Sequence, residues 1–372
     1  MKICDTVTNS VWFDPRVIKQ IDQYSSYEDV ELSIVGKKCP MYKEEEVAKL
    51  PGKVELVSPP KKYVHSVFIN LWDFWTMSRA IIRTKADIIH ANDLDALVPA
   101  FIAARKLKCK LIYDTHEVFL QNNWVYNNRI FYHFWKFFES RIIRKVDLVV
   151  CVSNAAADYI CELYKIKRPM VVTNCVNRIT ATRDIIKHNG FEVLMHGKFY
   201  AGRGYDLMVQ AAKLSSNSDI KYAFRGFGSM ETELRQYVED NKLSNVIFYP
   251  PVKTRELLYS ATSSHVGVAI TVPYCLNFKL SVSNKLFEYL GAGLPVIMSD
   301  IPEHRYLNDR YQFGVVLKEL TPECLNSAVL RLYNDKEFYA QCVRNAQRLS
   351  EELCWEVEFK RLYEVERKML NN

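Results

Sequence analysis

A glycine-flanked pair of cations near the middle of the chain is placed where an anion can bind. In residues 196–204, HGKFYAGRG, Lys198 and Arg203 stand five positions apart, after an apolar run and before a helical pattern. A helix that begins after glycines exposes its first backbone N–H groups, and these groups bind anions. Gly197, Lys198 and Arg203 therefore predict a site for a phosphate group, with a solvated basic loop as the alternative.

A second candidate site lies in residues 283–300, where a polar loop, a short helical pattern, a glycine break and an apolar run follow one another. Lys285 and Glu288 are three positions apart and so share one face of the predicted helix. We expect Glu288 in the first turn, where the helix dipole favours a carboxylate, and where it can accept hydrogen bonds from two hydroxyls. Backbone N–H groups of the loop, at Ser283 and Asn284, would face a bound anion. The alternative is a surface Lys–Glu pair on a packing helix.

Polar side chains also follow three apolar runs in the first half of the chain: Asp14 and Arg16, Asp93, and His116. A histidine in such a place can hydrogen-bond a substrate and exchange a proton near neutral pH, and an arginine suits a phosphate. Asp14 and Arg16 are equally well explained as a helix start, with aspartate at the N-cap and proline next to it. Asp93 and Asp95 form a nominal DxD metal motif, but Asp95 falls where a helix begins, so we predict no metal site.

Short apolar runs alternate with amphipathic helical patterns from end to end of the chain. The apolar runs predict strands at residues 2–8, 31–36, 86–91, 110–114, 147–153, 170–173, 191–196, 222–225, 246–249, 266–271, 295–299 and 314–317. The patterns between them predict helices at residues 15–24, 66–84, 94–106, 128–145, 154–164, 205–214, 230–241, 254–261, 284–292, 321–333 and 336–353. Alternation of this kind produces parallel sheets with helices on both faces.

A polar segment at residues 174–190 separates two such series. A chain of 372 residues is also too long for a single core. We therefore predict the α/β class, with two doubly wound Rossmann-like domains, residues 1–175 and 176–354, that face each other across a cleft. The charged helix predicted at residues 355–372 is expected to pack back across the junction. Ligands of such sheets bind beyond the carboxyl ends of the strands, where the polar segments above lie.

Residues 283–300, SNKLFEYLGAGLPVIMSD, resemble the donor-site signature of the retaining glycosyltransferases of family 4, in the branch with the pattern NKLFEYxxxGxPVI. The resemblance covers nearly the whole chain. It implies the GT-B fold, a nucleotide diphosphate-sugar donor, no cofactor and no metal ion. It also implies catalytic roles for four residues: His116 near the reaction centre, Lys198 and Arg203 on the diphosphate, and Glu288 on the ribose. The family usually shows the arginine before the lysine, and the two are exchanged here.

Further segments resemble family positions less specifically. Residues 225–228, RGFG, resemble the turn beside the nucleotide, although a structural turn explains a lone glycine pair as well, and residues 250–252, PPV, resemble the loop beside the base. Many members carry an acid where this chain has Leu280, so the donor sugar stays open. The predicted donor-binding residues are Gly197, Lys198, Arg203, Gly226, Val252, Ser283, Asn284, Lys285 and Glu288. The predicted acceptor-side residues are Asp14, Arg16, Asp93 and His116.

Bulk composition excludes several classes of protein. The net charge of +7 is too small to indicate nucleic-acid binding. No apolar run approaches the roughly 18 residues of a membrane span, and no secretory signal precedes the first predicted strand. Ten scattered cysteines without a CxxC pair indicate reduced thiols. We therefore expect a cytoplasmic protein, with association to the inner face of the cell membrane as an option.

Residues 119–145 mix many aromatic side chains with arginines and lysines. This composition suits a membrane interface and a lipid-linked acceptor. A pair of core-packing helices, with residues 61–85 as the second helix, explains it equally well.

The features and the resemblance together predict a metal-independent, retaining hexosyltransferase of cell-surface polysaccharide synthesis in bacteria. The donor would be a UDP-sugar, with a GDP-sugar as the other option, and the acceptor a glycan or a lipid-linked molecule. No carboxylate is placed to act as a nucleophile, so the resemblance implies front-face attack with the leaving diphosphate as the base. Two alternatives are a nucleotide-sugar 2-epimerase of the same fold, which needs paired acids, and an inactive nucleotide-sugar-binding subunit, which Leu280 motivates.

Overall fold

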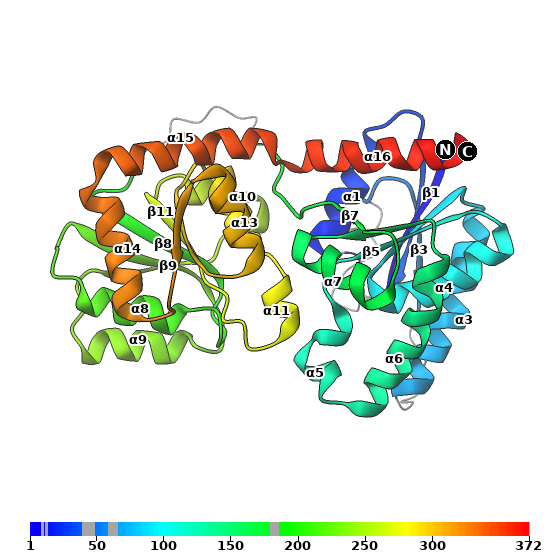
Figure 1. Cartoon of the computed structure of the whole chain (residues 1–372), viewed down its shortest axis with the longest axis horizontal. Helices are drawn as coiled ribbons and strands as arrows, with labels where there is room; N and C mark the ends of the chain where they lie inside the picture. The colour runs from blue at the N-terminus through cyan, green and yellow to red at the C-terminus, as the bar shows by residue number, and fades with distance from the viewer. Residues whose placement is uncertain (9–10, 12–13, 39–48, 59–65, 179–185, 372) are drawn as a thin grey trace. The chain divides into compact units, whose positions relative to one another are not determined.

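The computed structural model describes residues 1–8, 11, 14–38, 49–58, 66–178 and 186–371. These residues form two units (Figure 1). The N-terminal unit comprises Met1–Thr173 and Glu358–Asn372, and the C-terminal unit comprises Asn174–Val357. The last helix, α16 (Trp355–Asn371), begins in the C-terminal unit and belongs to the N-terminal unit from Glu358 onward. Part of the polar segment at residues 174–190 lies outside the described residues.

In the described part of the N-terminal unit, seven parallel strands form one sheet in the order β3-β2-β1-β4-β5-β6-β7. The strands are β1 (Lys2–Val7), β2 (Glu31–Lys37), β3 (Lys53–Val57), β4 (Ile88–Asn92), β5 (Lys110–Thr115), β6 (Leu148–Cys151) and β7 (Met170–Val171). The helices are α1 (Pro15–Ser25), α3 (Ser66–Thr84), α4 (Asp93–Leu107), α5 (Asn123–Tyr126), α6 (Arg129–Ile142) and α7 (Asn154–Tyr164), with the 3-10 helices η2 (Phe119–Gln121) and η3 (Ile143–Lys145).

Six of these strands match the sequence prediction, and β3 does not. The five residues of β3, KVELV, lie at the edge of the sheet, and none of them is fully buried. A half-exposed edge strand has no continuous apolar run, so the pattern used for the inner strands does not detect it. All five residues of β4, in contrast, are buried.

In the described part of the C-terminal unit, six parallel strands form the second sheet, in the order β10-β9-β8-β11-β12-β13. The strands are β8 (Phe191–Lys198), β9 (Ile220–Phe227), β10 (Val246–Tyr249), β11 (Val266–Ala269), β12 (Val296–Ser299) and β13 (Gly314–Leu317). The helices are α8 (Tyr205–Leu214), α9 (Glu231–Asp240), α10 (Thr254–Ala261), α11 (Leu276–Leu280), α12 (Asn284–Gly291), α13 (Pro302–Tyr311), α14 (Pro322–Asn334) and α15 (Lys336–Glu352).

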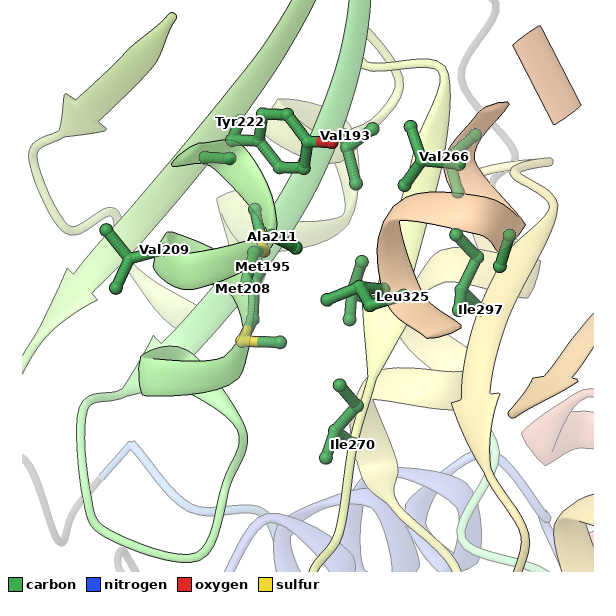
Figure 2. Packing of buried hydrophobic residues seen from close by; sticks show 14 of the residues in the cluster. Val193, Met195, Met208, Val209, Ala211, Tyr222, Val266, Ile270, Ile297 and Leu325 are labelled. Carbon is green, nitrogen blue, oxygen red and sulfur yellow. The ribbon is translucent and has the colours of Figure 1, made fainter. Parts of the chain in front are cut away.

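Strand residues of the C-terminal unit alternate between two apolar clusters, one on each face of the sheet. On β8, Val193 and Met195 belong to the cluster drawn in Figure 2, whereas Leu194 between them belongs to the other. Met208 of α8 and Leu325 of α14 cover the first face. Parallel strands are normally buried on both faces in this way, which is why they have continuous apolar sequences.

The prediction of two doubly wound, Rossmann-like domains is confirmed. Strand order reverses between β1 and β4 in one sheet and between β8 and β11 in the other. Ligands of such folds bind at these switch points, beyond the carboxyl ends of the strands. A site is therefore expected where the chain leaves β1, β4 and β5 in the N-terminal unit and β8 in the C-terminal unit.

No described helix combines the length and the apolar character that crossing a membrane requires. The nine cysteines within the described ranges are free thiols, and Cys39 lies outside those ranges. Burial raises the pKa of the Cys4 and Cys151 thiols well above the usual range, which makes them poor nucleophiles.

Candidate active site

The turn between β8 and α8 is built around glycines. Gly204 precedes α8 with φ +79°, and a Cβ at this position would lie 2.5 Å from Cγ2 of Ile270, so only glycine fits. Gly197, with φ +114°, leaves space for Lys285, whose Cε would lie 3.2 Å from an added Cβ. The turn places the N-terminus of α8 beside the carboxyl end of β8, which is the arrangement that an anion site requires.

Lys285 lies against this turn and is held by a tyrosine. Its Nζ donates to the hydroxyl of Tyr205 at 3.0 Å, and that hydroxyl donates to the carbonyl of His196 at 2.9 Å. Burial and the charge of Arg203 lower the pKa of Lys285 to about 7, against the opposing effect of Glu288. A bound anion would raise this pKa and stabilise the ammonium form, so the position favours a negatively charged ligand.

The two cations of the glycine-rich turn differ in their surroundings. Arg203 is partly exposed, and its Cζ lies 4.7 Å from the centroid of the Phe278 ring. Lys198 is the last residue of β8 and is exposed, on the same sheet face as His196 two positions earlier. Arg203 is thus close enough to Lys285 to affect its pKa, while Lys198 stands at the end of the strand.

Glu288 is paired with a buried histidine. Its Oε2 lies 2.7 Å from Nε2 of His196, whose side chain is fully buried, while the side chain of Glu288 is 23% exposed. Helix α12 begins at Asn284, so Glu288 lies in its second turn and the first-turn prediction is wrong. Lys285 occupies the first turn instead. The histidine, rather than the helix N-terminus, is therefore the group that orients this carboxylate.

The other predicted donor-binding residues lie around the same end of the sheet. Gly226 lies in β9 and pairs with Gly197 of β8, and an added Cβ would lie 1.9 Å from the carbonyl oxygen of Gly197. The close approach of the two strands therefore requires a glycine here, and Gly226 is not part of a turn. Ser283 is buried at the N-cap of α12, and the exposed Asn284 accepts a hydrogen bond from Nδ2 of Asn174 at 3.1 Å. Val252 is partly exposed in the loop between β10 and α10.

Leu280, which replaces the acid found in many family members, is the last residue of α11 and is 9% exposed. An apolar side chain in this place offers no hydrogen bond to a sugar hydroxyl. The identity of the donor sugar therefore depends on other groups.

In the N-terminal unit, His116 joins residues from three strand ends. Its Nδ1 lies 2.9 Å from Oδ2 of Asp14, between β1 and α1, and its Nε2 lies 3.0 Å from Oδ1 of Asn92, at the end of β4. The backbone N–H of His116 donates to Oδ1 of Asp93 at 2.9 Å, and Asp93 has φ +66°. Because Nδ2 of Asn92 donates to Asp5, its oxygen faces the histidine. Both ring nitrogens of His116 thus meet acceptors.

These contacts give His116 a positive charge. Burial alone would lower the pKa of His116, but Asp93 and Asp14 raise it to about 9. The same charge outweighs burial at Asp14 and lowers its pKa to about 2. Burial raises the pKa of Asp93 to about 8. At neutral pH the cluster therefore holds an imidazolium whose two N–H groups donate to Asp14 and Asn92, next to carboxyl groups that can orient a substrate hydroxyl.

Arg16 lies beneath this cluster instead of facing a ligand. It is 1% exposed, and its Nε and Nη2 donate to the two carboxylate oxygens of Asp114 at 2.9 and 3.1 Å. Its Nη1 donates to the carbonyl of Val172 at 3.0 Å. The assignment of Arg16 to an acceptor phosphate is corrected by this burial. The helix-start alternative is confirmed, since Oδ1 of Asp14 accepts from the N–H groups of Arg16 and Val17.

One group of potential metal ligands is found in the part of the chain that the structure describes. Ligand atoms of Asp14, Asp93 and His116 all lie within 4.8 Å of one another, and Asp95 is not among them. A histidine must lose its second proton before it can bind a metal. In the structure, Nδ1 of His116 and Oδ2 of Asp14 instead pair with each other at 2.9 Å.

Four further residues of these two clusters were not predicted from the sequence: Asn92, Asp114, His196 and Tyr205. Asn92 and Asp114 end neighbouring strands in register with one another, so their position after buried runs was an available signal. His196 is the first residue of the glycine-rich segment, in which only the two cations, Lys198 and Arg203, were predicted to bind a ligand. Tyr205 acts through Lys285, eighty positions away, and no local pattern indicates such a contact.

Two family models match the chain. Residues 16–178 match the model Glycosyltransferase Family 4, and residues 190–335 match the model Glycosyl transferases group 1. No curated protein matches the chain.

Solved structures share the fold over nearly the whole chain at low sequence identity. A glycosyltransferase from Rickettsia africae ESF-5 superposes with a TM-score of 0.77 and 14% identity, over 100% of this chain and 99% of its own. Anabaena Alr3699/HepE, in complex with UDP and glucose, gives 0.75 and 14%, over 99% and 100%, and the same protein is also known with UDP-glucose. A putative UDP-N-acetylglucosamine 2-epimerase from Listeria monocytogenes gives 0.66 and 12%, over 97% and 94%.

At these identities the superpositions show the fold alone, and they confirm the predicted GT-B fold. The two family matches add the activity class, and together they span both units. By these matches and this fold, the chain is a glycosyltransferase of the GT-B class, with a family 4 domain followed by a group 1 domain.

Proposed function

We propose that this glycosyltransferase moves a hexose, with retention, from a nucleotide diphosphate-sugar to a glycan or lipid-linked acceptor. The observation that carries the proposal is the position of Lys285 and Arg203 at the turn between β8 and α8. Two cations beside a helix N-terminus match a diphosphate, and Glu288 beside them matches the hydroxyls of a ribose. The C-terminal unit would thus bind the donor.

A UDP-sugar is favoured as the donor, and a GDP-sugar is the second option. Supporting this order, the similar Anabaena protein is known in complexes with UDP and with UDP-glucose. No described side chain in the loop near Val252 distinguishes uracil from guanine on chemical grounds. We propose that the enzyme takes part in the synthesis of bacterial cell-surface polysaccharide, at the cytoplasmic side of the membrane.

In the proposed reaction, the acceptor oxygen bonds to the sugar carbon from the face that the diphosphate leaves. The bond between that carbon and the diphosphate oxygen breaks, and the acceptor proton passes to the leaving diphosphate. Negative charge that grows on the diphosphate is stabilised by Arg203, Lys285 and Lys198. In the N-terminal unit, the imidazolium of His116 would exchange its hydrogen bond to Asn92 for one to the substrate, and Asp14 and Asp93 would orient the acceptor hydroxyl.

Glu288→Gln tests the donor site. The substitution keeps the size of the side chain and a hydrogen bond to His196 but removes the charge that a ribose diol would meet. We expect the donor dissociation constant to rise roughly tenfold or more, since a charged hydrogen bond contributes about 1.5–3 kcal/mol. Calorimetric titration with UDP-, GDP- and dTDP-sugars measures the effect and identifies the nucleotide. The melting temperature without ligand should change little.

A matched control is Glu323→Gln, which neutralises an exposed glutamate at the start of α14 in the same unit. Its donor affinity should equal that of the wild type. Unaltered affinity in Glu288→Gln, or loss of folding without ligand, would return Glu288 to a structural role. Epimerisation of a UDP-sugar without any acceptor would support the epimerase alternative, and absence of slow donor hydrolysis would support an inactive binding subunit.

Transfer should keep most of its rate in excess EDTA. The reason is that Lys285 and Arg203 supply the charge that a divalent ion supplies elsewhere. Rates with EDTA, and with manganese added back, measure this. Loss of activity in EDTA with recovery in manganese would contradict it. Comparison of Asp93→Asn with Asp95→Asn would then locate the ion, because only Asp93 shares the cluster with Asp14 and His116.

A further inference from the structure

Helices α3, α5 and α6 of the N-terminal unit expose several large apolar side chains. Between 42% and 76% of each residue is exposed, and the set, which we name the apolar face, comprises Trp72, Trp75, Trp124, Tyr126, Ile130 and Phe137. Burying such side chains on folding would have been favourable, so a concentration of them on one surface indicates a partner or a membrane. The packing alternative from sequence holds only for neighbours such as Trp135, which is 2% exposed.

Ring contacts connect α3 with α6 beneath the apolar face. Trp72 and Trp75 lie 5.6 Å apart between ring centroids on α3. Phe74 of α3 lies 5.4 Å from Phe138 of α6, which in turn lies 5.3 Å from Phe137. Figure 1 shows α3 beside α6, with α5 next to α6 at one end of this unit.

The charges of these three helices are sorted by sign. Their two acids are buried: Asp73 accepts from Lys37 at 2.5 Å, and Glu139 accepts from the hydroxyls of Tyr113 and Tyr164. The exposed charged residues on the described side chains of α3, α5 and α6 are all cations: Arg79, Arg129, Lys136 and Arg141, and also Arg83, which pairs with Glu55 of β3.

Two of these cations lie over exposed rings of the apolar face. Cζ of Arg141 is 3.7 Å from the centroid of Phe137, and Cζ of Arg79 is 4.8 Å from that of Trp75. Positively charged side chains and aromatic rings are therefore direct neighbours on the apolar face.

We propose that the apolar face docks on a lipid bilayer that contains anionic lipids. Tryptophan and tyrosine concentrate at the interface between lipid and water, and each arginine or lysine near an anionic leaflet adds about 1 kcal/mol. Since no described helix can cross a membrane, the contact would be interfacial. A second copy of the same face would bring cations against cations, so charge complementarity favours the bilayer over self-association.

Docking would bring the lipid surface near the acceptor-side cluster. The chain passes from His116 through η2 into α5, and Nδ2 of Asn122 donates to Oε1 of Glu117 at 2.5 Å within this connection. Two residues of the apolar face, Trp124 and Tyr126, thus lie within ten positions of His116 in one hydrogen-bonded segment. An acceptor carried by a lipid fits this placement. This statement about the acceptor rests on the proposed function, whereas the docking itself does not.

Co-sedimentation with vesicles tests the docking without any donor or acceptor. The full chain should bind vesicles of phosphatidylcholine and phosphatidylglycerol, and bind pure phosphatidylcholine much less. Lys136→Glu with Arg141→Glu should weaken binding at least roughly twenty-fold, since each lost cation corresponds to about fivefold. The matched control, Arg344→Glu with Arg348→Glu on α15 of the other unit, makes the same change in net charge and should bind like the wild type.

Trp75→Ala with Trp124→Ala tests the apolar contribution and should also weaken vesicle binding, while transfer to a soluble acceptor stays unchanged. Tryptophan emission of the wild type should shift to shorter wavelength on binding, and the double variant, which keeps only Trp72 of the three tryptophans on the apolar face, should show a smaller shift. No binding to anionic vesicles, or equal losses in the α15 control, would overturn the proposal. So would a wild-type dimer in sedimentation velocity that the same substitutions dissociate, because the face would then be a protein interface. If the protein transfers sugar but does not bind vesicles, the docking proposal is wrong and the proposed function is unaffected.

Discussion

Replacing Arg203 with alanine is expected to lower kcat on the order of a hundredfold, the effect typical of losing one charge-stabilising donor. The leaving diphosphate gains negative charge as the bond to the sugar breaks, so a cation beside it acts more strongly in the transition state than on the bound donor. Contact with the Phe278 ring at 4.7 Å holds the guanidinium at the turn while leaving it partly exposed. Steady-state kinetics at saturating donor measure the change.

The control for this prediction is an arginine with similar surroundings away from the turn. Arg331 lies over the ring of Phe338, with Cζ 3.9 Å from the centroid, and Arg331→Ala should leave kcat unchanged. Arg203→Lys should recover part of the lost rate, because it keeps the charge but not the planar donor geometry. A kcat for Arg203→Ala equal to that of the wild type would remove the residue from the mechanism.

Much of the fold follows from the sequence because its strands are buried on both faces. The run that forms β4 is apolar enough to be recognised without knowing its neighbours, and its five residues are all buried. The helix α13 escaped prediction for the opposite reason. Its buried face consists of Glu303, His304 and Leu307, so it has no apolar periodicity to detect. The five residues of α11 are too few for a helical period.

The positions of the candidate site residues follow from the rule that ligands bind at the carboxyl ends of parallel strands. Asp14, Asp93 and His116 come together in one cluster for that reason, although they are far apart in sequence. Their partners do not follow from the rule. The pairing of Glu288 with His196 depends on how α12 packs on β8. The predicted start of this helix at residue 284 agrees with α12, but Glu288 stands four positions further on and so falls in the second turn. Side-chain partners are set by tertiary packing, which local patterns do not contain.

Arg16→Met is expected to lower the free energy of unfolding by about 3–5 kcal/mol, because it removes one partner of a buried ion pair. Asp114 is fully buried, and although burial opposes it, Arg16 holds the pKa of that carboxyl well below the usual range. Without the guanidinium, Asp114 keeps contacts with Gln20 and His90 but loses its two-point partner. The melting temperature should fall by roughly 10 °C. Hydrogen exchange of peptides that contain β5 would locate the loss in the N-terminal unit.

The control is Arg105→Met, which removes an exposed arginine of α4 and should change stability by less than about 0.5 kcal/mol. If the ion pair is the cause, combining Arg16→Met with Asp114→Asn should cost less than the sum of the two single changes, because the second change removes the charge left unpaired by the first. An Arg16 that binds the acceptor would behave differently: the melting temperature would stay at the wild-type value, and the acceptor KM would rise. The two measurements on one variant thus separate a buried structural arginine from a ligand-binding one.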